Sequence, residues 1–444
     1  MSVTKEQLLK DAQKWSALSS PMHKFYGGKI EVMPKCAIRN LQDFNIWYTP
    51  GVAQVCKDIE KDKDKAYELT SKWNYVAVVS DGTRVLGLGD IGGQAGMPVM
   101  EGKALIFKYL GGVDAFPICL ATKNEEEIIQ AVKWIEPSFG GINLEDLSSP
   151  KCFSILDRLR KEMSIPVWHD DQQGTAAVIL AATVNALKFV GKKLHSAKFT
   201  IVGSGAANTR TFYVLTAAGV DPKNIVMTDS SGILSISRDD LKSSYKWDLA
   251  LKSNGEGLEG GLREACKGSD ILIAASKPGP GVIKMNDVRV MASNAVVFAC
   301  ANPIPEIWPW EAKEAGVKVV ATGRSDFPNQ VNNSLVFPAI FRGALDVRAK
   351  TITDEMCISS AKALARYAEE KGLSENYIIP AMDEWEIYPL QAAETGTMAV
   401  DQGLARKKMS KKEIYDGAAS IIQRTQKIVK LLMEQRYISP TPSI

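Results

Sequence analysis

Five short apolar segments, separated by stretches with helical patterns, dominate the middle of the sequence and narrow the range of folds open to it. Strands that alternate with helices indicate a parallel sheet covered by helices on both faces, because parallel strands must be joined by long crossover connections. The sequence therefore predicts a doubly wound α/β domain, with strands at residues 198–202, 224–228, 270–274, 295–299 and 317–321.

A glycine-rich turn joins the first of these strands to a helix expected from about residue 209 to residue 218. In this position the free N–H groups at the start of a helix receive the pyrophosphate of a dinucleotide. The usual third glycine of such a turn is replaced by Asn208, so the turn on its own would also suit a different nucleotide. The residues expected to bind the cofactor here are Gly203, Ser204, Gly205, Ala206 and Ala207.

The residue at the end of the second strand bears on which dinucleotide binds. Asp229 is placed to accept a hydrogen bond from a ribose hydroxyl, which favours NAD. Ser230 and Ser231, together with Arg238 or Lys246 further along, would instead suit the 2′-phosphate of NADP. The sequence leaves NAD and NADP as alternatives.

Two pairs of adjacent acidic residues each follow a predicted strand. Glu145 and Asp146 come after one short apolar segment, and Asp170 and Asp171 come after another. Open α/β sheets bind their ligands beyond the carboxyl ends of the strands, so we expect the two pairs to lie near a ligand. Hard oxygen donors of this kind suit Mg²⁺ or Mn²⁺. Taken alone, Asp170 and Asp171 would equally be a plain helix cap.

Composition excludes several kinds of chemistry. Only three histidines occur in 444 residues, so a histidine-rich zinc site is not expected, and carboxylates, lysine and tyrosine must carry any catalysis. The net charge of +3 gives no reason to expect binding to nucleic acid or to an anionic membrane. The seven cysteines are scattered and no signal-peptide pattern or long apolar run is visible, so we expect a cytoplasmic protein.

The N-terminal part contains two further candidate residues. A helix is expected near residues 4–18 and a short strand at residues 29–32, and Tyr48 stands just before a Pro-Gly turn. The glycines between Gly87 and Gly96 would let the backbone approach a small ligand closely. The helix that follows carries Lys103 and places it beside this loop. The alternative is that Lys103 is an ordinary solvated lysine on the helix surface.

Two asparagines stand at the ends of later segments. Asn302 follows the fourth strand of the doubly wound domain, and Asn333 belongs to an Asn-Asn pair that opens a helix. Their amide groups would bind a carboxylate or the carboxamide of nicotinamide, or would simply form turns.

Six motifs follow one another in unbroken order between about residue 15 and residue 390. They are Tyr48-Thr49-Pro50-Gly51, Val85 to Gly92, Pro98 to Lys103, Asn143 to Asp146, Asp170 to Thr175, and Asn332-Asn333 with Phe337-Pro338. Together they resemble the motifs of malic enzymes, in the shorter microbial form of that family. The resemblance implies an N-terminal α/β catalytic domain, a Rossmann-like dinucleotide-binding domain and a helical C-terminal segment.

The same resemblance implies an activity and a set of site residues. The activity is the oxidative decarboxylation of L-malate to pyruvate and CO₂ with reduction of NAD or NADP, dependent on Mg²⁺ or Mn²⁺, together with decarboxylation of oxaloacetate. A homodimer is expected. The implied residues are Glu145, Asp146 and Asp171 as metal ligands, Tyr48, Lys103 and Asp170 in catalysis, and Arg84, Asn302 and Asn333 in malate binding, with Asn302 also at the cofactor.

We expect a catalytic domain over residues 1–165, a dinucleotide domain over residues 166–390 and a helical segment over residues 391–444. Two other functions remain open to such a chain. One is a dehydrogenase that oxidises without decarboxylation, such as an amino-acid dehydrogenase, although the paired acidic motifs argue against it. The other is a redox-sensing module that binds NAD(P)H and a partner, for which Lys103 and Tyr48 would be dispensable.

Overall fold

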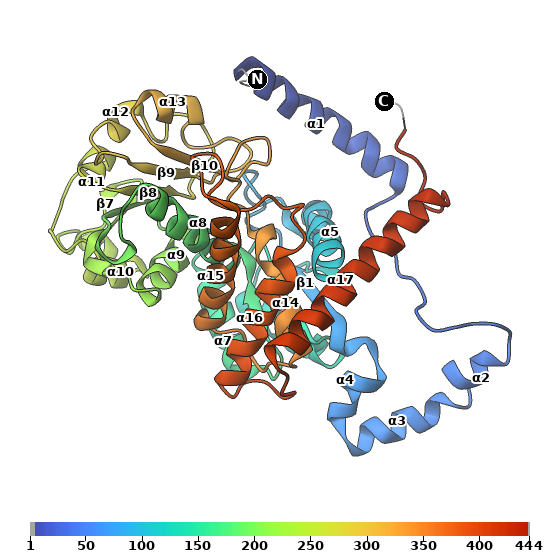
Figure 1. Cartoon of the computed structure of the whole chain (residues 1–444). Helices are drawn as coiled ribbons and strands as arrows, with labels where there is room; N and C mark the ends of the chain where they lie inside the picture. The colour runs from blue at the N-terminus through green and yellow to red at the C-terminus, as the bar shows by residue number, and fades with distance from the viewer. Residues whose placement is uncertain (1–4, 443–444) are drawn as a thin grey trace.

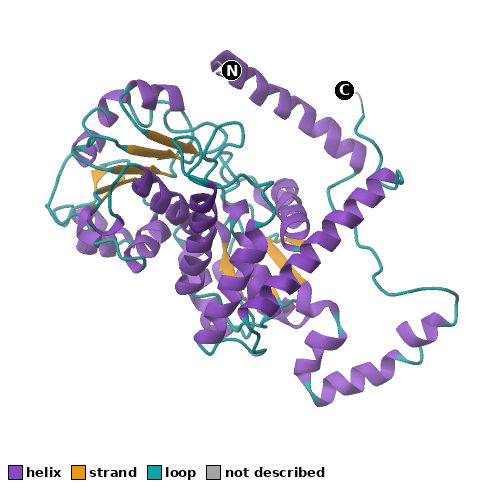
Figure 2. Ribbon diagram, viewed as in Figure 1, coloured by secondary structure: helices purple, strands orange, loops and turns teal. Residues whose placement is uncertain are grey.

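Two parallel sheets organise the part of the chain that the computed structural model describes, residues 5–442. Each sheet has helices on its faces, and the two sheets lie side by side with long helices between and beside them (Figures 1 and 2). The predicted α/β architecture with a helical C-terminal segment is therefore confirmed.

The first sheet contains four parallel strands in the order β2-β1-β3-β4. Side chains alternate along its central strand, because successive residues of a strand point to opposite faces. Val76 and Val78 join the core under helix α5, while Ala77 and Val79 join the core under α6 and α7. The elements are β1 (Tyr75–Ser80), α5 (Gly92–Gly111), β2 (Asp114–Cys119), α6 (Glu125–Ile135), β3 (Gly141–Leu144), α7 (Lys151–Glu162) and β4 (Val167–His169).

The second sheet contains six strands in the order β10-β9-β8-β5-β6-β7, and only the short β7 is antiparallel. The first strand in sequence, β5, lies inside the sheet, and the chain builds outward from it in both directions, as a doubly wound fold requires. All five predicted strands are present within two residues of the expected positions. The elements are β5 (Phe199–Val202), α9 (Ala206–Ala217), β6 (Ile225–Asp229), β7 (Gly232–Ile233), α10 (Lys246–Lys252), α11 (Leu262–Cys266), β8 (Ile271–Ala274), α12 (Met285–Val288), β9 (Val296–Ala299), α13 (Pro309–Glu314) and β10 (Val319–Thr322).

One buried helix leads from the first sheet to the second. α8 (Thr175–Phe189) follows β4 and packs against α9 and α15, and most of its small side chains are fully buried. The later helices return to the first sheet, where α14 and α17 pack against α5. These helices are α14 (Phe337–Asp346), α15 (Asp354–Lys371), α16 (Ile387–Asp401) and α17 (Lys411–Glu434). The division of the chain at residues 165 and 390 stays a prediction.

An N-terminal arm, residues 27–61, extends away from both sheets (Figure 1). It follows the helix α1 (Lys5–Tyr26) and contains α2 (Asp43–Trp47) and α3 (Val52–Lys61) before the chain returns through α4 (Ala66–Leu69). The strand predicted at residues 29–32 is not present among the described residues, and Val32 is 76% exposed. The prediction was wrong because an apolar alternation only indicates a strand where a neighbouring strand is available to pair with it.

Among the described residues, no helix combines the length and the apolar character that crossing a bilayer would need.

Candidate active site

A cavity of about 470 Å³ lies beyond the carboxyl ends of strands from both sheets. Its walls include residues that directly follow β3, β8 and β9, the first residues of helix α9 after β5, and Asp171 from η4 (Asp170–Gly174), the turn after β4. Parallel strands end at one edge of their sheet, so short segments far apart in sequence meet there.

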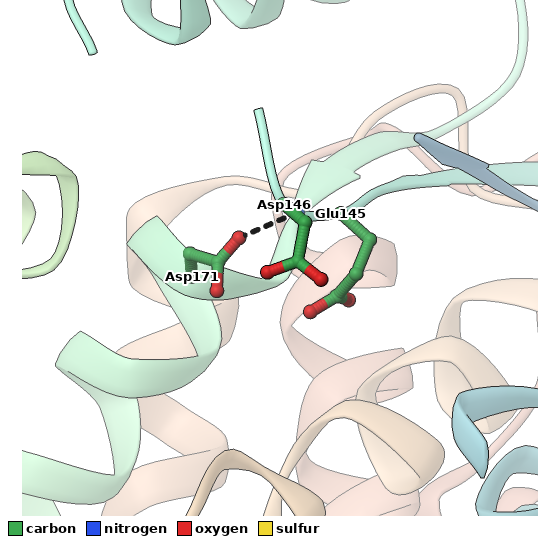
Figure 3. A group of neighbouring side chains, drawn as sticks. All are labelled: Glu145, Asp146 and Asp171. Atoms are coloured by element: carbon green, nitrogen blue, oxygen red, sulfur yellow. Dashed lines mark hydrogen bonds between the residues drawn. The ribbon is translucent and has the colours of Figure 1, made fainter. Parts of the chain in front are cut away.

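Three carboxylates converge on this cavity. Glu145 and Asp146 follow β3, and Asp171 comes from the turn after β4. Each offers one oxygen, and these oxygens lie within 4.8 Å of one another (Figure 3). The backbone N–H of Asp146 donates to Oδ2 of Asp171 at 2.9 Å, which ties the ends of the two strands together. The expected meeting of the two acidic pairs is therefore found.

Burial and mutual repulsion both act on the carboxylates of this cluster. Burial, together with repulsion from the other carboxylates, raises the pKa of Asp146 to about 8 and raises that of Glu145 well above its ordinary value. Oδ2 of Asp146 is buried and has no hydrogen-bond partner among the described residues. A set of hard oxygen donors with one unsatisfied atom fits a divalent cation such as Mg²⁺ or Mn²⁺.

Lys103 lies against the same carboxylates. Its Nζ is 3.1 Å from Oε1 of Glu145, pairs closely with Asp170, and donates to Oδ1 of Asn333 at 3.2 Å. Burial acts to lower the pKa of Lys103, but the surrounding carboxylates outweigh it and raise that pKa above the ordinary lysine value. Lys103 is therefore a buried amine in direct contact with carboxylates rather than a surface lysine.

Asp170 is held by the turn in which it lies. The residues after β4 form one π-helical turn, a feature often found at functional sites. Trp168 donates from Nε1 to Oδ1 of Asp170 at 3.2 Å. A Cβ on Gly174 would collide with the Asp170 carboxylate, so only glycine leaves room for it. Asp170 is therefore a positioned partner of Lys103, and the plain helix cap is not what the structure shows.

The glycine-rich turn has the form that the dinucleotide motif predicts. Gly203 has a φ of 95°, which favours glycine, and Gly205 precedes the first turn of α9. Gly205, Ala206 and Ala207 line the cavity, whereas Gly203 and Ser204 form the turn behind them. Asn208 is fully buried and donates to the carbonyl of Val202 at 2.7 Å, so its side chain points into the fold rather than toward a pyrophosphate.

Asp229 stands at the end of β6, as expected, but it is not exposed for a ligand. Arg238 and Lys246 both donate to its carboxylate, at 2.8 Å and 2.6 Å. Arg84, Asn302 and Asn333 all line the cavity.

Tyr48 is a predicted catalytic residue that the structure places away from the cavity. It lies between α2 and α3 on the arm, the residue is 70% exposed, and it is not part of the cavity wall. The structure of one chain therefore brings Lys103 and the carboxylates together without the tyrosine.

Sequence reasoning missed Glu306, which is hydrogen-bonded to two loops of the cavity. Its carboxylate is completely buried and accepts from the backbone N–H of Ser276 at 2.8 Å and from that of Ala301 at 3.0 Å. A single acidic residue within the apolar run Pro303 to Trp308 was the signal available. Buried carboxylates are uncommon unless they are paired.

Acidic side chains, a charged lysine and a dinucleotide turn around one cavity define a nucleotide-dependent oxidoreductase. Residues 27–160 match the family model for the N-terminal domain of malic enzyme, and residues 172–398 match that for its NAD-binding domain. The chain is 52% identical over 382 residues to the NAD-dependent malic enzyme of Geobacillus stearothermophilus, covering 86% of this chain and 78% of that protein.

Two further relatives extend the comparison. The NADP-dependent malic enzyme of Escherichia coli is 38% identical over 97% of this chain, which spans 58% of the length of that protein. The crystal structure of the Entamoeba histolytica malic enzyme has a TM-score of 0.96 and 45% identity, and the match covers 100% of this chain and 93% of that one. The chain therefore belongs to the malic enzyme family.

Proposed function

We propose that this enzyme converts L-malate to pyruvate and CO₂ with reduction of a nicotinamide dinucleotide, that it requires a divalent cation, and that it also decarboxylates oxaloacetate. The observation that carries the proposal is the cluster of Glu145, Asp146 and Asp171 beside Lys103 in a cavity bordered by the glycine turn. The proposed setting is the cytoplasm, which suits a chain with seven free cysteines.

The three carboxylates would hold Mg²⁺ or Mn²⁺ through hard oxygen donors. Such an ion, when bound, supplies positive charge that polarises the oxygens of the substrate at C1 and C2. Arg84, Asn302 and Asn333, which all line the cavity, would bind the carboxylates of malate and keep C2 facing the cofactor.

Lys103 would remove the proton of the C2 hydroxyl as the hydride leaves C2. A lysine acts as a base only when neutral, and the carboxylates around Lys103 oppose this. Positive charge brought to the same carboxylates would weaken their hold on the Lys103 proton. Asp170 would orient the amine through its direct ion pair.

Tyr48 would donate the proton that C3 of enolpyruvate needs after CO₂ leaves, because a phenol is protonated at neutral pH. We propose that it reaches the cavity of a second copy of the chain. The arm keeps its own shape, with Arg39 paired to Asp43 at 2.8 Å and Trp47 donating to the carbonyl of Ala37 at 3.1 Å.

The same arm leaves many large apolar side chains uncovered. Exposed apolar surface of this extent on one segment marks a contact with another protein. In a twofold dimer the same contact forms twice, so each copy would complete the site of the other. The exposed side chains are Val32, Met33, Ile38, Leu41, Phe44, Ile46 and Trp47.

The test is an assay of malate with NAD and with NADP, each with and without a chelator, followed by absorbance of the reduced cofactor and by pyruvate formation. Pyruvate formed in step with reduced cofactor, and lost on chelation, is the expected result. Oxidation without CO₂ release or without need of a cation would favour a simple dehydrogenase. Binding of NAD(P)H without turnover would favour a redox-sensing module.

A further inference from the structure

Each of the two carboxylates that contact Lys103 also accepts a hydrogen bond from a completely buried side chain. Asn143 donates from Nδ2 to Oε2 of Glu145 at 3.0 Å. Trp168 donates from Nε1 to Oδ1 of Asp170 at 3.2 Å. Lys103 contacts the other oxygen in each case, Oε1 of Glu145 and Oδ2 of Asp170. One oxygen of each carboxylate therefore faces the lysine, and the other is held by a neutral N–H donor.

The first sheet places the two donors side by side. Asn143 on β3 is in register with Trp168 on β4. In both strands the carboxylate comes two residues after the donor, and side chains two residues apart along a strand lie on the same face. The same donor-to-carboxylate contact is therefore repeated on two neighbouring parallel strands.

The direction of the Lys103 amine depends on the acceptors around it. A lysine head group has three donor positions on a flexible stem, so its neighbours decide where it points. Here they are Glu145, Asp170 and Oδ1 of Asn333, the last at 3.2 Å. A carboxylate turns easily about its last bond, because such torsions have broad minima. Fixing the far oxygen of each carboxylate therefore fixes the direction in which its near oxygen meets Lys103.

We propose that Asn143 and Trp168 are a pair of positioning residues, which fix the carboxylates of Glu145 and Asp170 and thereby aim the amine of Lys103 at the substrate. This inference rests on the proposed function, in which Lys103 acts on the C2 hydroxyl of malate. Neither donor lines the cavity, so both act through the carboxylates. A displacement of a catalytic group by about 1 Å costs about 100-fold in rate, so such positioning matters for turnover.

The two donors should differ in their effect on cation binding. Glu145 belongs to the carboxylate cluster proposed to hold the divalent cation, whereas Asp170 does not. Removing the Asn143 donor should therefore disturb both the cation and Lys103. Removing the Trp168 donor should disturb Lys103 alone.

A purely structural role gives a different expectation. Trp168 is part of the core, where its ring meets that of Phe341 edge to face with the centroids 6.4 Å apart. If packing and the pairing of buried polar groups were the only roles, replacing either donor would lower the melting temperature and leave the turnover of the folded enzyme unchanged. Positioning predicts a selective loss in kcat.

The experiment combines calorimetric titration with Mn²⁺ in the absence of substrate, steady-state kinetics at saturating cation, and melting temperatures. Trp168→Phe should lower kcat by about tenfold and leave Mn²⁺ affinity and the KM for malate unchanged. Asn143→Leu should lower both Mn²⁺ affinity and kcat by about tenfold, and Asn143→Ala serves if the leucine variant does not fold. Phe341→Leu is the matched control, because Phe341 packs against Trp168. It should lower the melting temperature while kcat and Mn²⁺ affinity stay native.

The double variant tests whether the two donors act on the same amine. Because both act through Lys103, the combined loss in kcat should be clearly smaller than the product of the two single losses. Losses that multiply fully would mean that the donors act independently and would overturn the pairing.

Other results would also overturn the inference. They are a native kcat in Trp168→Phe, native Mn²⁺ affinity and kcat in the Asn143 variants, and a loss of kcat in Phe341→Leu as large as that in Trp168→Phe. A native chain that does not reduce the dinucleotide with malate would overturn the proposed function, and this inference with it. Normal native turnover with unaffected variants would overturn this inference alone.

Discussion

Mixing two variants that we expect to be inactive tests whether Tyr48, the proposed proton donor, acts across a dimer. Tyr48→Phe removes the phenol hydroxyl on the arm, and Lys103→Ala removes the amine in the cavity. If Tyr48 serves the partner's site, a mixed dimer of the two variants contains one site with both defects and one site with neither. If Tyr48 serves its own chain, each site of the mixed dimer carries one defect.

The expected magnitude follows from counting sites. Random pairing of equal amounts makes about half of the dimers mixed, and each mixed dimer then has one complete site out of two. Activity should therefore rise from near zero for each variant alone to about one quarter of the native value.

The two variants carry different affinity tags, are expressed together, and are assayed for pyruvate formation before and after isolation of the mixed dimer. The isolated mixed dimer should have about half the native activity. Tyr437→Phe, a change at another exposed tyrosine, is the control and should leave activity unchanged when placed in either chain. A mixed dimer as inactive as its parents, or a chain that is monomeric at assay concentrations, would refute the exchange of arms.

Three changes at or beside the cavity give further predictions. Asp171→Ala should lower divalent cation binding and turnover by at least about 100-fold, measured by calorimetry and by the coupled assay; near-normal turnover at saturating Mg²⁺ would remove Asp171 from the ligand set. Lys103→Ala should slow malate oxidation by about 1000-fold while dinucleotide binding is kept, and an unchanged rate would exclude it as the base. Gly174→Ala should displace the Asp170 carboxylate, costing about 1–3 kcal/mol in stability, seen as a lower melting temperature, along with most of the activity. Native stability and a native rate in Gly174→Ala would show that the turn accommodates a Cβ at this position without displacing Asp170.

The elements that could be predicted are those fixed by local pattern. The strands of the second sheet are short, apolar and bounded by turns, and such segments can only be buried in a sheet covered on both faces. The two acidic pairs meet for the same reason, because their positions directly after β3 and β4 follow once those strands are parallel neighbours. Their position in the sheet was predictable from the strands alone.

The features that could not be predicted depend on the three-dimensional path of the chain and on polar contacts that apolar spacing does not encode. The exposure of Tyr48 follows from the path of the arm, which no periodicity encodes. The inward turn of Asn208 depends on free carbonyls at the end of β5, and the saturation of Asp229 depends on a loop that brings Arg238 and Lys246 back to it. The Asn208 and Asp229 features are hydrogen bonds of polar side chains, and sequence patterns report apolar spacing far better than polar pairing.

The buried carboxyl of Glu306 has two effects that can be measured separately. Its burial changes the pH dependence of stability, and its hydrogen bonds hold two loops of the cavity in place. Burial raises the pKa of this carboxyl, although hydrogen bonds from Ser276 and Ala301 act to lower it. The folded protein therefore binds the Glu306 proton more tightly than the unfolded chain does. Stability from this group is present at low pH and is lost as pH rises from the unfolded pKa, near 4.5, through the raised folded one.

Glu306→Gln cannot ionise, so it removes the loss of stability with rising pH. It also places an amide N–H₂ group against one of the two backbone N–H donors, which costs about 1–3 kcal/mol of stability. The stability of the variant relative to the native protein should therefore improve as pH rises from about pH 4 to about pH 8, measured by denaturant unfolding at each pH. Dinucleotide binding should be weaker in the variant at every pH, because the loops at Ser276 and Ala301 lose a shared anchor. Glu311→Gln is the control, since Glu311 only caps the nearby helix α13. A stability difference that does not change with pH would mean that Glu306 titrates alike in the folded and unfolded chains, and the argument from burial would fail.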